Sequence, residues 1–208
     1  MLVKKFNVGD LGTNCYLVAD ETTKECILID TGDASSLLDN YIEEQGLTVK
    51  YIIFTHGHFD HVDGVNYYYD KFGCEILMHS ADAVALTDVN SAYSLGYSSR
   101  STPVNPSKFL CDGDIIKFGK CELKVIHTPG HTLGGICLYS DGVLISGDTL
   151  FYRSIGRTDF WGGKFETLQQ SILKIYKLPD NTVVYPGHGD CTTIGDEKFN
   201  NPFVREMQ

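Results

Sequence analysis

The stretch THGHFDH, Thr55–His61, places three histidines and one aspartate within seven residues of a chain that has seven histidines in all. His56, His58 and Asp60 recur at every second position, so an extended backbone would point their side chains to one side. The preceding residues, KYIIFT (50–55), are almost wholly apolar, as is typical of a strand covered on both faces. The stretch therefore predicts potential metal ligands at the carboxyl end of a buried strand, where ligands gather in open α/β sheets.

Three later segments repeat this arrangement, because in each an apolar run ends in a glycine-containing turn that holds a potential ligand. They are KVIHTPGHT (124–132) with His127 and His131, VLISGDT (143–149) with Asp148, and VVYPGHGD (183–190) with His188. Taken alone, His131, Asp148 or His188 is best explained as a hydrogen-bonded loop residue. Their joint occurrence in equivalent turns favours a shared site instead.

The donor types indicate which ions such a site would hold. Imidazole and carboxylate suit zinc, iron or manganese, and the turns lack the thiolates of a closed structural zinc site. The donors are too many for one tetrahedral ion, and they fit two ions that share a carboxylate. His127 and His79 match no second ligand set, so we expect them to be structural or orienting histidines. Asp30, at the end of CILID (26–30), is either a helix cap or, as we prefer, a partner that orients a ligand.

Composition narrows the class of protein. Hydrophobic residues make up 42% and charged residues 21% of the 208 residues, as in a folded globular domain. A formal net charge of -10 disfavours nucleic acid as a partner, since that binding rests on a basic surface. No apolar run predicts a signal peptide or a membrane span, so we expect a cytoplasmic protein. Seven cysteines without a C-x-x-C pair predict free thiols rather than disulfides.

The chain reads as a layered α/β domain in which strands and helices alternate in both halves. Strands are expected near 2–8, 13–20, 25–31, 50–55, 74–79 and 181–190, the last running into His188, and hairpins over 114–128 and over 135–148 around Asp141-Gly142. Helices are expected over 34–46, capped by Asp33 with Leu37, Leu38, Tyr41 and Ile42 on its apolar face, and over 62–73, 81–88 (capped by Ser80) and 164–179. The irregular stretch 89–107 is expected to be a loop over the site.

The motifs together resemble those of the metallo-β-lactamase-fold hydrolases. THGHFDH, GHT (130–132), SGDT (146–149) and PGHG (186–189) are similar to that family's motifs in order, over nearly the whole chain. The resemblance implies an α/β fold, an αββα sandwich with metals between two sheets at one edge, as a single domain over 1–208. It implies that His56, His58 and His131 hold one ion, that Asp60, His61 and His188 hold a second, that Asp148 bridges them, and that Asp30 orients a ligand. The implied cofactors are two divalent metal ions, zinc first, with iron or manganese as alternatives.

The segment GDTLFYRSIGRTDFWGG (147–163) is most similar to small glyoxalase II-type hydrolases without a separate C-terminal glutathione-binding domain. This resemblance implies hydrolysis of a thioester such as S-D-lactoylglutathione by a metal-bridging hydroxide, with Asp60 and His61 in the catalytic centre. Arg157, Arg153 and Lys164 are the cations expected to bind carboxylates of a glutathione-derived substrate. For Arg153 and Lys164 ordinary surface charge is an equal alternative, and Arg157 has an ion pair with Asp159 as its alternative.

Two other functions stay open. Persulfide dioxygenases, which use a single iron, share the 147–163 segment, and a non-catalytic metal-stabilised binding protein would retain the same ligands. Antibiotic hydrolysis is disfavoured because classical β-lactamases of this fold lack the bridging aspartate. We expect a small-molecule partner, and neither nucleic acid nor a membrane.

Overall fold

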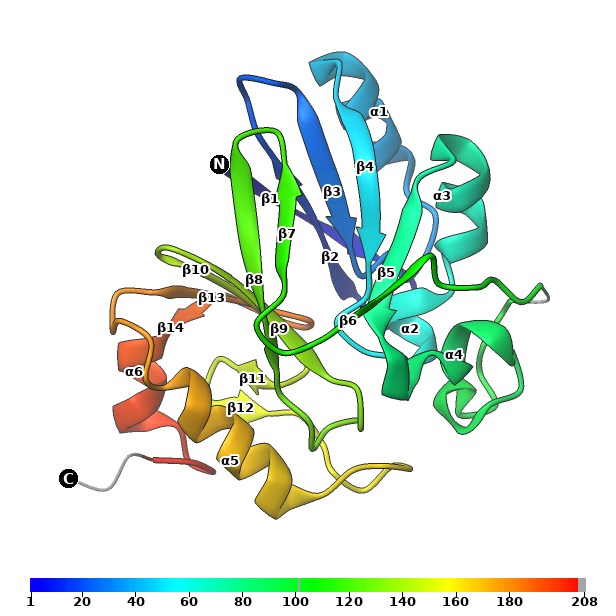
Figure 1. Cartoon of the computed structure of the whole chain (residues 1–208). Helices are drawn as coiled ribbons and strands as arrows, with labels where there is room; N and C mark the ends of the chain where they lie inside the picture. Colours follow the sequence, from blue (N-terminus) through cyan, green and yellow to red (C-terminus); the bar gives the residue numbers. More distant parts are fainter. Residues whose placement is uncertain (101, 206–208) are drawn as a thin grey trace.

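Two six-stranded β-sheets pack face to face, with helices on both outer sides (Figure 1). The structure is a computed structural model that describes residues 1–100 and 102–205, so position 101 of the expected 89–107 loop lies outside the described residues. The first sheet has the order β1-β2-β3-β4-β5-β6. Its strands are β1 (Leu2–Val8), β2 (Thr13–Ala19), β3 (Glu25–Ile29), β4 (Thr48–Ile53), β5 (Glu75–His79) and β6 (Lys108–Leu110). β1 to β3 pair antiparallel, and β3 to β6 pair parallel.

The second sheet has the order β14-β13-β10-β9-β8-β7. Its strands are β7 (Ile115–Phe118), β8 (Cys121–His127), β9 (Ile136–Ser140), β10 (Val143–Gly147), β13 (Val183–Pro186) and β14 (Thr192–Thr193). β10 and β13 run parallel, and the other pairs are antiparallel. A small separate pair, β11 (Leu150–Phe151) and β12 (Ser154–Ile155), follows β10. Both expected hairpins are confirmed, including the turn at Asp141-Gly142.

The four-layer arrangement follows from the alternation of side chains along the central strands. In β2, Tyr16 and Val18 join the core between the two sheets, whereas Cys15 and Leu17 join the core beneath the first helical layer. A third core packs the second sheet against its own helices. Each fully buried Leu, Ile or Val contributes roughly 1.5 to 3 kcal/mol to folding. The expected αββα sandwich is confirmed.

Helices α1 (Ser36–Gln45) and α3 (Val65–Phe72) cover the first sheet, and α5 (Phe165–Ile175) and α6 (Ile194–Asn200) cover the second (Figure 1). Short helical turns lie near the edge where the parallel strands end. They are α2 (Phe59–Val62), η1 (Ser80–Asp82), α4 (Val84–Thr87) and η2 (Ala92–Ser94). In the described part of the chain, no helix has the length and apolar composition that a membrane span needs.

Several local predictions were wrong. The cap of α1 is Ser35, whose Oγ accepts a hydrogen bond from Leu38 N (3.4 Å), because Asp33 Oδ1 instead accepts from Ala34 N (2.7 Å). Leu37 is 73% exposed, so the apolar face of that helix is narrower than expected. The cap of η1 is His79 rather than Ser80, because the Nδ1 atom of His79 accepts a hydrogen bond from the backbone N–H of Ala81 (3.2 Å).

The predicted helix over 62–73 is instead interrupted at Gly64. The backbone N–H of Gly64 donates to Thr31 O (2.9 Å), and a Cβ at this position would lie 2.4 Å from that oxygen. Because the N–H of Gly64 bonds to Thr31 and not within the helix, α2 ends before Gly64 and α3 begins after it.

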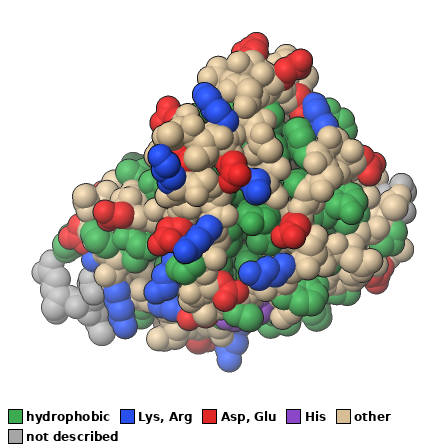
Figure 2. Space-filling view, turned by 45° about the horizontal axis from the view of Figure 1, so that its top comes forward, with side chains coloured by type: hydrophobic (Ala, Val, Ile, Leu, Met, Phe, Trp, Pro, Cys, Tyr) green, Lys and Arg blue, Asp and Glu red, His purple; other side chains and the backbone are tan. Residues whose placement is uncertain are grey.

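The edge of the sandwich at the amino end of β2 differs from the opposite edge. At the amino end, Thr13 Oγ1 donates a hydrogen bond to Asp60 Oδ2 (3.1 Å). At the opposite edge, Asp20 accepts a hydrogen bond from Lys120 N (2.7 Å) and Glu25 accepts one from Gly119 N (2.6 Å). These bonds fasten the turn between β7 and β8 to the first sheet. On the outside, Figure 2 shows acidic and basic side chains interspersed on one face.

Candidate metal centre

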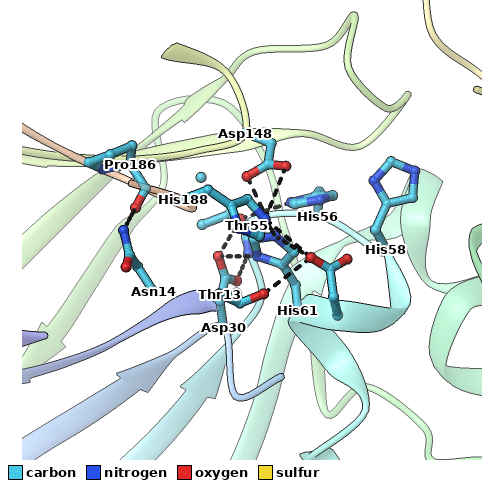
Figure 3. Close-up of polar contacts among 12 residues, drawn as sticks. Thr13, Asn14, Asp30, Thr55, His56, His58, His61, Asp148, Pro186 and His188 are labelled. Carbon is cyan, nitrogen blue, oxygen red and sulfur yellow. Dashed lines mark hydrogen bonds and ion pairs between the residues drawn. The ribbon is translucent and has the colours of Figure 1, made fainter. Parts of the chain in front are cut away.

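Four loops of the two sheets meet at one edge and bring the seven predicted ligands together. Figure 3 labels five of them: His56, His58, His61, Asp148 and His188. His56 and His58 follow β4, and Asp60 and His61 lie in α2. The other three follow strands of the second sheet: His131 comes after β8, Asp148 after β10 and His188 after β13. Four of the ligands therefore reach the site from the first sheet and three from the second.

The first ligand group is His56, His58 and His131. One ring nitrogen from each lies within 4.8 Å of the others, and His58 Nδ1 lies 2.9 Å from His131 Nε2. All three side chains are buried. Burial, together with the neighbouring histidines, lowers the pKa of His58 to about 3 and that of His56 well below its usual range. The rings of His56 and His58 are therefore neutral and offer lone pairs to a cation.

The second ligand group is Asp60, His61 and His188. Asp60 Oδ2 lies 3.1 Å from His188 Nε2, and the two histidines approach to 3.3 Å through their Nε2 atoms. Burial favours neutral His61, but the surrounding carboxylates, Asp60 first, outweigh burial and raise its pKa to about 10. Burial also opposes ionisation of Asp60, yet the histidines around it hold the pKa of its carboxyl well below its usual range. Carboxylates thus converge on His61 strongly enough to favour a positive charge there, and the same surroundings suit a metal cation.

Asp148 lies between the two groups. Its Oδ2 is 3.5 Å from His131 Nε2 and 3.7 Å from His188 Nε2, and its Oδ1 is 3.4 Å from His61 Nε2. Within residues 1–100 and 102–205, the buried atoms His56 Nε2 and Asp148 Oδ1 have no hydrogen-bond partner. Buried polar atoms rarely lack a hydrogen-bond partner, so these two unpaired atoms are suited to coordinate bound cations. Five imidazoles and two carboxylates in two groups indicate two divalent metal ions.

Hydrogen bonds behind the ligands fix which ring nitrogen faces the site. Asp30 Oδ2 lies 3.0 Å from His61 Nδ1 and also accepts from the Thr55 hydroxyl (2.7 Å), while its Oδ1 accepts from Thr55 N (2.7 Å). Asp30 is buried and has the left-handed φ of 57°. Both of its oxygens are occupied, so Asp30 is placed to orient His61 although it lies close to a ligand group. His131 Nδ1 lies 2.7 Å from Arg157 O in the same way.

The loop that carries His188 is held from β2. Asn14 Nδ2 donates to Pro186 O (2.8 Å), and the Tyr16 hydroxyl donates to the same oxygen (2.6 Å; Figure 3 labels Asn14 and Pro186). Gly187 is required here, since a Cβ would lie 2.1 Å from Asp148 Oδ1. The position of His188 relative to Asp148 therefore depends on the contact between the two sheets.

A buried carboxylate that the sequence did not suggest, Asp82, holds the loops of the first ligand group. Its Oδ2 accepts from Gly57 N (3.1 Å), and its Oδ1 accepts from Gly134 N (2.6 Å) and the Tyr93 hydroxyl (2.5 Å). Gly57 lies between two ligands, and Gly134 is three residues beyond His131. Cβ atoms at Gly57 and Gly134 would lie 2.7 Å from the Ala85 Cβ and from the Asp82 Cγ respectively. In the sequence, HSADAVAL looks like an ordinary helix start, so no pattern marked this residue.

Tyr93 extends this support to the 89–107 loop. Its buried ring lies 5.8 Å from the His58 ring and 5.3 Å from the Trp161 ring, centroid to centroid. The same loop is fastened to α2, because Asp63 accepts from Ser98 Oγ and Ser99 N, both at 2.7 Å. The loop therefore lies beside the ligands, as the sequence predicted.

A cavity of about 700 Å³ opens over the ligands. Besides the ligands His58, Asp60, His131, Asp148 and His188, its lining consists of Asp10, Leu11, Phe59, Leu95, Tyr97, Phe151, Ile155, Arg157 and Phe160. Of the three predicted substrate-binding cations, only Arg157 belongs to this lining. Arg153 instead pairs with Asp196 (3.1 Å), and Lys164, directly before α5, does not belong to the lining. Substrate binding by any of the three cations stays a prediction.

The remaining two histidines that were expected to be structural lie outside both ligand groups. The rings of His79 and His127 stack at 4.2 Å, and His127 Nε2 lies 3.1 Å from Leu133 O. This contact holds the loop that follows His131.

A family profile described as the metallo-beta-lactamase superfamily matches residues 8–188. Among curated proteins, an uncharacterized protein of Mycobacterium leprae is 38% identical over 222 residues, covering 100% of both chains. The probable metallo-hydrolase YqgX of Bacillus subtilis is 34% identical over 97% of this chain and 96% of its own length. The hydroxyacylglutathione hydrolase GloC of Haemophilus influenzae is 36% identical over 92% of each chain.

Solved structures give the same likeness. The BLEG-1 B3 metallo-beta-lactamase superposes with a TM-score of 0.90 at 35% identity, over 98% of this chain and 99% of the other. A di-iron-bound form of TTHA1623 has a TM-score of 0.86 at 34% identity, over 97% and 100%. ETHE1 from Myxococcus xanthus has a TM-score of 0.79 at 28% identity, over 98% and 84%.

Proposed function

The chain belongs to the metallo-β-lactamase superfamily and is a metallo-hydrolase of that superfamily, and from this premise we propose that it hydrolyses thioesters. The observation that carries the proposal is the pair of ligand groups joined by Asp148 at the base of a largely apolar cavity. Zinc is the proposed metal, with iron or manganese as alternatives, because histidine and aspartate ligands accept all three.

The residues have separate tasks in this proposal. His56, His58 and His131 hold one ion, Asp60, His61 and His188 hold the other, and Asp148 contacts both groups. When bound, two divalent ions supply a nucleophile from water near neutral pH and polarise the carbonyl under attack. Asp30 keeps His61 Nδ1 occupied so that Nε2 faces the site. The carbonyl oxygen of Arg157 does the same for His131.

The cavity supports a leaving group that needs little protonation. Apart from the metal ligands, the titratable side chains in its lining are Asp10, Tyr97 and Arg157, and the first two are exposed to solvent. None of them is buried beside the ligands as a general acid would be. A thiolate departs without such help, whereas an amine or alkoxide requires it. The similarity to GloC, named a hydroxyacylglutathione hydrolase, supports the same reaction class.

Two alternatives remain. The protein is a mononuclear-iron persulfide dioxygenase, or it is a metal-stabilised binding protein that catalyses no reaction. The complete second ligand group favours the hydrolase, because a one-ion enzyme does not need Asp60, His61 and His188 together. Open ligand sets in a cavity are typical of catalytic rather than structural metal sites.

The test is anaerobic hydrolysis of a set of thioesters, including S-D-lactoylglutathione and S-phenyl thioesters, followed by loss of thioester absorbance. The metal content of the same sample is measured by mass spectrometry. Turnover that is lost in Asp60→Asn supports the hydrolase. Metal-loaded protein that cleaves no thioester refutes it, and iron near one per chain with persulfide-dependent oxygen uptake establishes the dioxygenase instead.

A further inference from the structure

The walls of the cavity are apolar beyond the ligands. Seven lining residues are aromatic or aliphatic: Leu11, Phe59, Leu95, Tyr97, Phe151, Ile155 and Phe160. They come from four separate parts of the chain: the turn after β1, the start of α2, the 89–107 loop and the 151–160 segment. The apolar surface therefore surrounds the ligands on several sides. Leu11 and Tyr97 are 58% and 76% exposed, an arrangement that leaves large hydrophobic side chains in water unless a ligand covers them.

The charged side chains in the lining do not suit an anionic substrate. Arg157 Nε and Nη2 donate to the two carboxylate oxygens of Asp159, both at 2.7 Å. The guanidinium carbon also lies 3.7 Å from the centroid of the Phe160 ring. Its charge is thus paired, and its flat face covers an aromatic wall. The other charged residue in the lining that is not a ligand is Asp10, whose carboxylate would repel an incoming anion.

A glutathione thioester carries two carboxylates and therefore needs cations that this lining does not leave free. Arg153 is paired with Asp196 outside the lining, and Lys164 lies outside it as well. Bound metal ions would attract anions, but in the proposed reaction they bind the reacting carbonyl and its nucleophile and not the carboxylates of the thiol part. The rest of the substrate meets hydrocarbon and a paired arginine.

We infer that the natural substrates are thioesters with an apolar acyl group and an uncharged thiol part, and that Asp159 sets this preference by neutralising Arg157. The inference rests on the proposed thioester hydrolysis and names its substrate class. A cavity of about 700 Å³ has room for a medium-sized molecule of this kind. Each methylene buried on these walls is worth about a threefold to fourfold gain in binding.

The experiment compares kcat/KM for S-D-lactoylglutathione with a series of neutral S-benzyl thioesters, acetyl, butyryl and hexanoyl, whose alkyl thiolate leaving group resembles that of glutathione, on the metal-loaded full chain. We expect the neutral series to be preferred and to improve about threefold per methylene up to hexanoyl. Asp159→Asn releases Arg157 and should raise kcat/KM for the anionic substrate about threefold to fivefold, as expected for an exposed charge pair. The gain for the anionic substrate should exceed any change that the same variant produces in kcat/KM for the neutral series.

The matched control is Asp196→Asn, which releases Arg153 from a comparable ion pair outside the cavity lining. It should change neither substrate class. Preference for S-D-lactoylglutathione in the wild type, or a neutral series without dependence on chain length, would overturn the inference while leaving thioester hydrolysis intact. An equal effect of both variants would assign the gain to overall charge and overturn the role of Asp159. Absence of turnover with every thioester would refute the proposed function itself.

Discussion

Replacing Asp82 by asparagine should weaken metal binding at the first ligand group and leave the second group intact. The carboxylate accepts three hydrogen bonds, from the backbone of Gly57 and Gly134 and from the Tyr93 hydroxyl. An asparagine can keep its oxygen toward Gly134 and Tyr93, but its NH2 group then faces the N–H of Gly57. Two donors would meet, and the loop between His56 and His58 would have to move.

The size of the effect follows from these contacts. An unsatisfied buried N–H costs about 1 to 3 kcal/mol, and a hydrogen bond to a charged acceptor is worth about 1 kcal/mol more than a neutral one. We therefore expect a loss of about 2 to 4 kcal/mol in the free energy of unfolding. Mutation of a residue that hydrogen-bonds the loops or side chains of metal ligands typically lowers metal affinity about 10-fold to 100-fold. We expect a loss in that range for the ion at His56, His58 and His131.

The assay is a chelator-competition titration with zinc that resolves two dissociation constants, combined with urea unfolding. Tyr93→Phe is a milder companion, because it removes one donor and leaves the carboxylate in place. The matched control is Asp20→Asn, since Asp20 also accepts three hydrogen bonds, from Lys120 N, Thr22 N and Thr23 Oγ1. Asp20 lies at the far end of the seven-residue strand β2, roughly 20 Å from the site.

The reasoning fails if Asp82→Asn binds both ions as tightly as the wild type. It also fails if both dissociation constants rise equally, or if Asp20→Asn produces the same change, because the effect would then be general destabilisation. A folded Tyr93→Phe variant with unaltered affinity at the first group would remove Tyr93 from the argument.

Other expectations follow from single features. Gly187→Ala should lower the bound metal per chain, measured by mass spectrometry, because its Cβ would lie 2.1 Å from Asp148 Oδ1. Leu38→Ala should cost about 2 to 5 kcal/mol in urea unfolding, whereas Leu37→Ala, at a 73% exposed position, should cost less than about 0.5 kcal/mol. Backbone hydrogen bonds from Lys120 and Thr22 hold the pKa of Asp20 at about 2, below its ordinary 3.8, so its stabilising contribution is complete above pH 4 and is lost as the pH falls toward 2. That acid dependence, followed by circular dichroism, should be smaller in Asp20→Asn. Chelation should lower Tm by about 5 to 10 °C in calorimetry when the free ion had been present at about 100 times its Kd, and re-addition of metal should restore it.

The ligand-bearing turns could be predicted because each leaves a local pattern in the chain. An apolar strand followed by glycine and a histidine or aspartate indicates both where a metal ligand lies and which donor atom it offers. The β-hairpins could be predicted for the same reason, because their strands and turns are neighbours in the sequence. The αββα layers were predicted from the family that the same motifs resemble.

What escaped prediction depends on contacts between segments far apart in the chain. Asp82 meets Gly134, 52 residues away, and nothing near either residue shows the pairing. The ion pair of Arg153 joins it to Asp196 in α6, 43 residues away, so the local sequence left substrate binding and surface charge equally open for this arginine. Helix caps failed for a smaller reason, because Asp33 and Ser35 are both good capping residues and the local backbone decides between them.

The division of each ligand group between the two sheets has a consequence for how the protein is made. Ribosomal synthesis delivers the ligands in chain order, so His56, His58, Asp60 and His61 emerge well before His131, and His188 comes last. A nascent chain therefore first presents a partial set of donors that belong to two different ions. Neither ion gains its full set until the second sheet has folded and docked against the first. Uptake of metal by a newly made chain would thus mark the end of its maturation, and a chain stalled before that point would compete poorly for scarce ions in the cell.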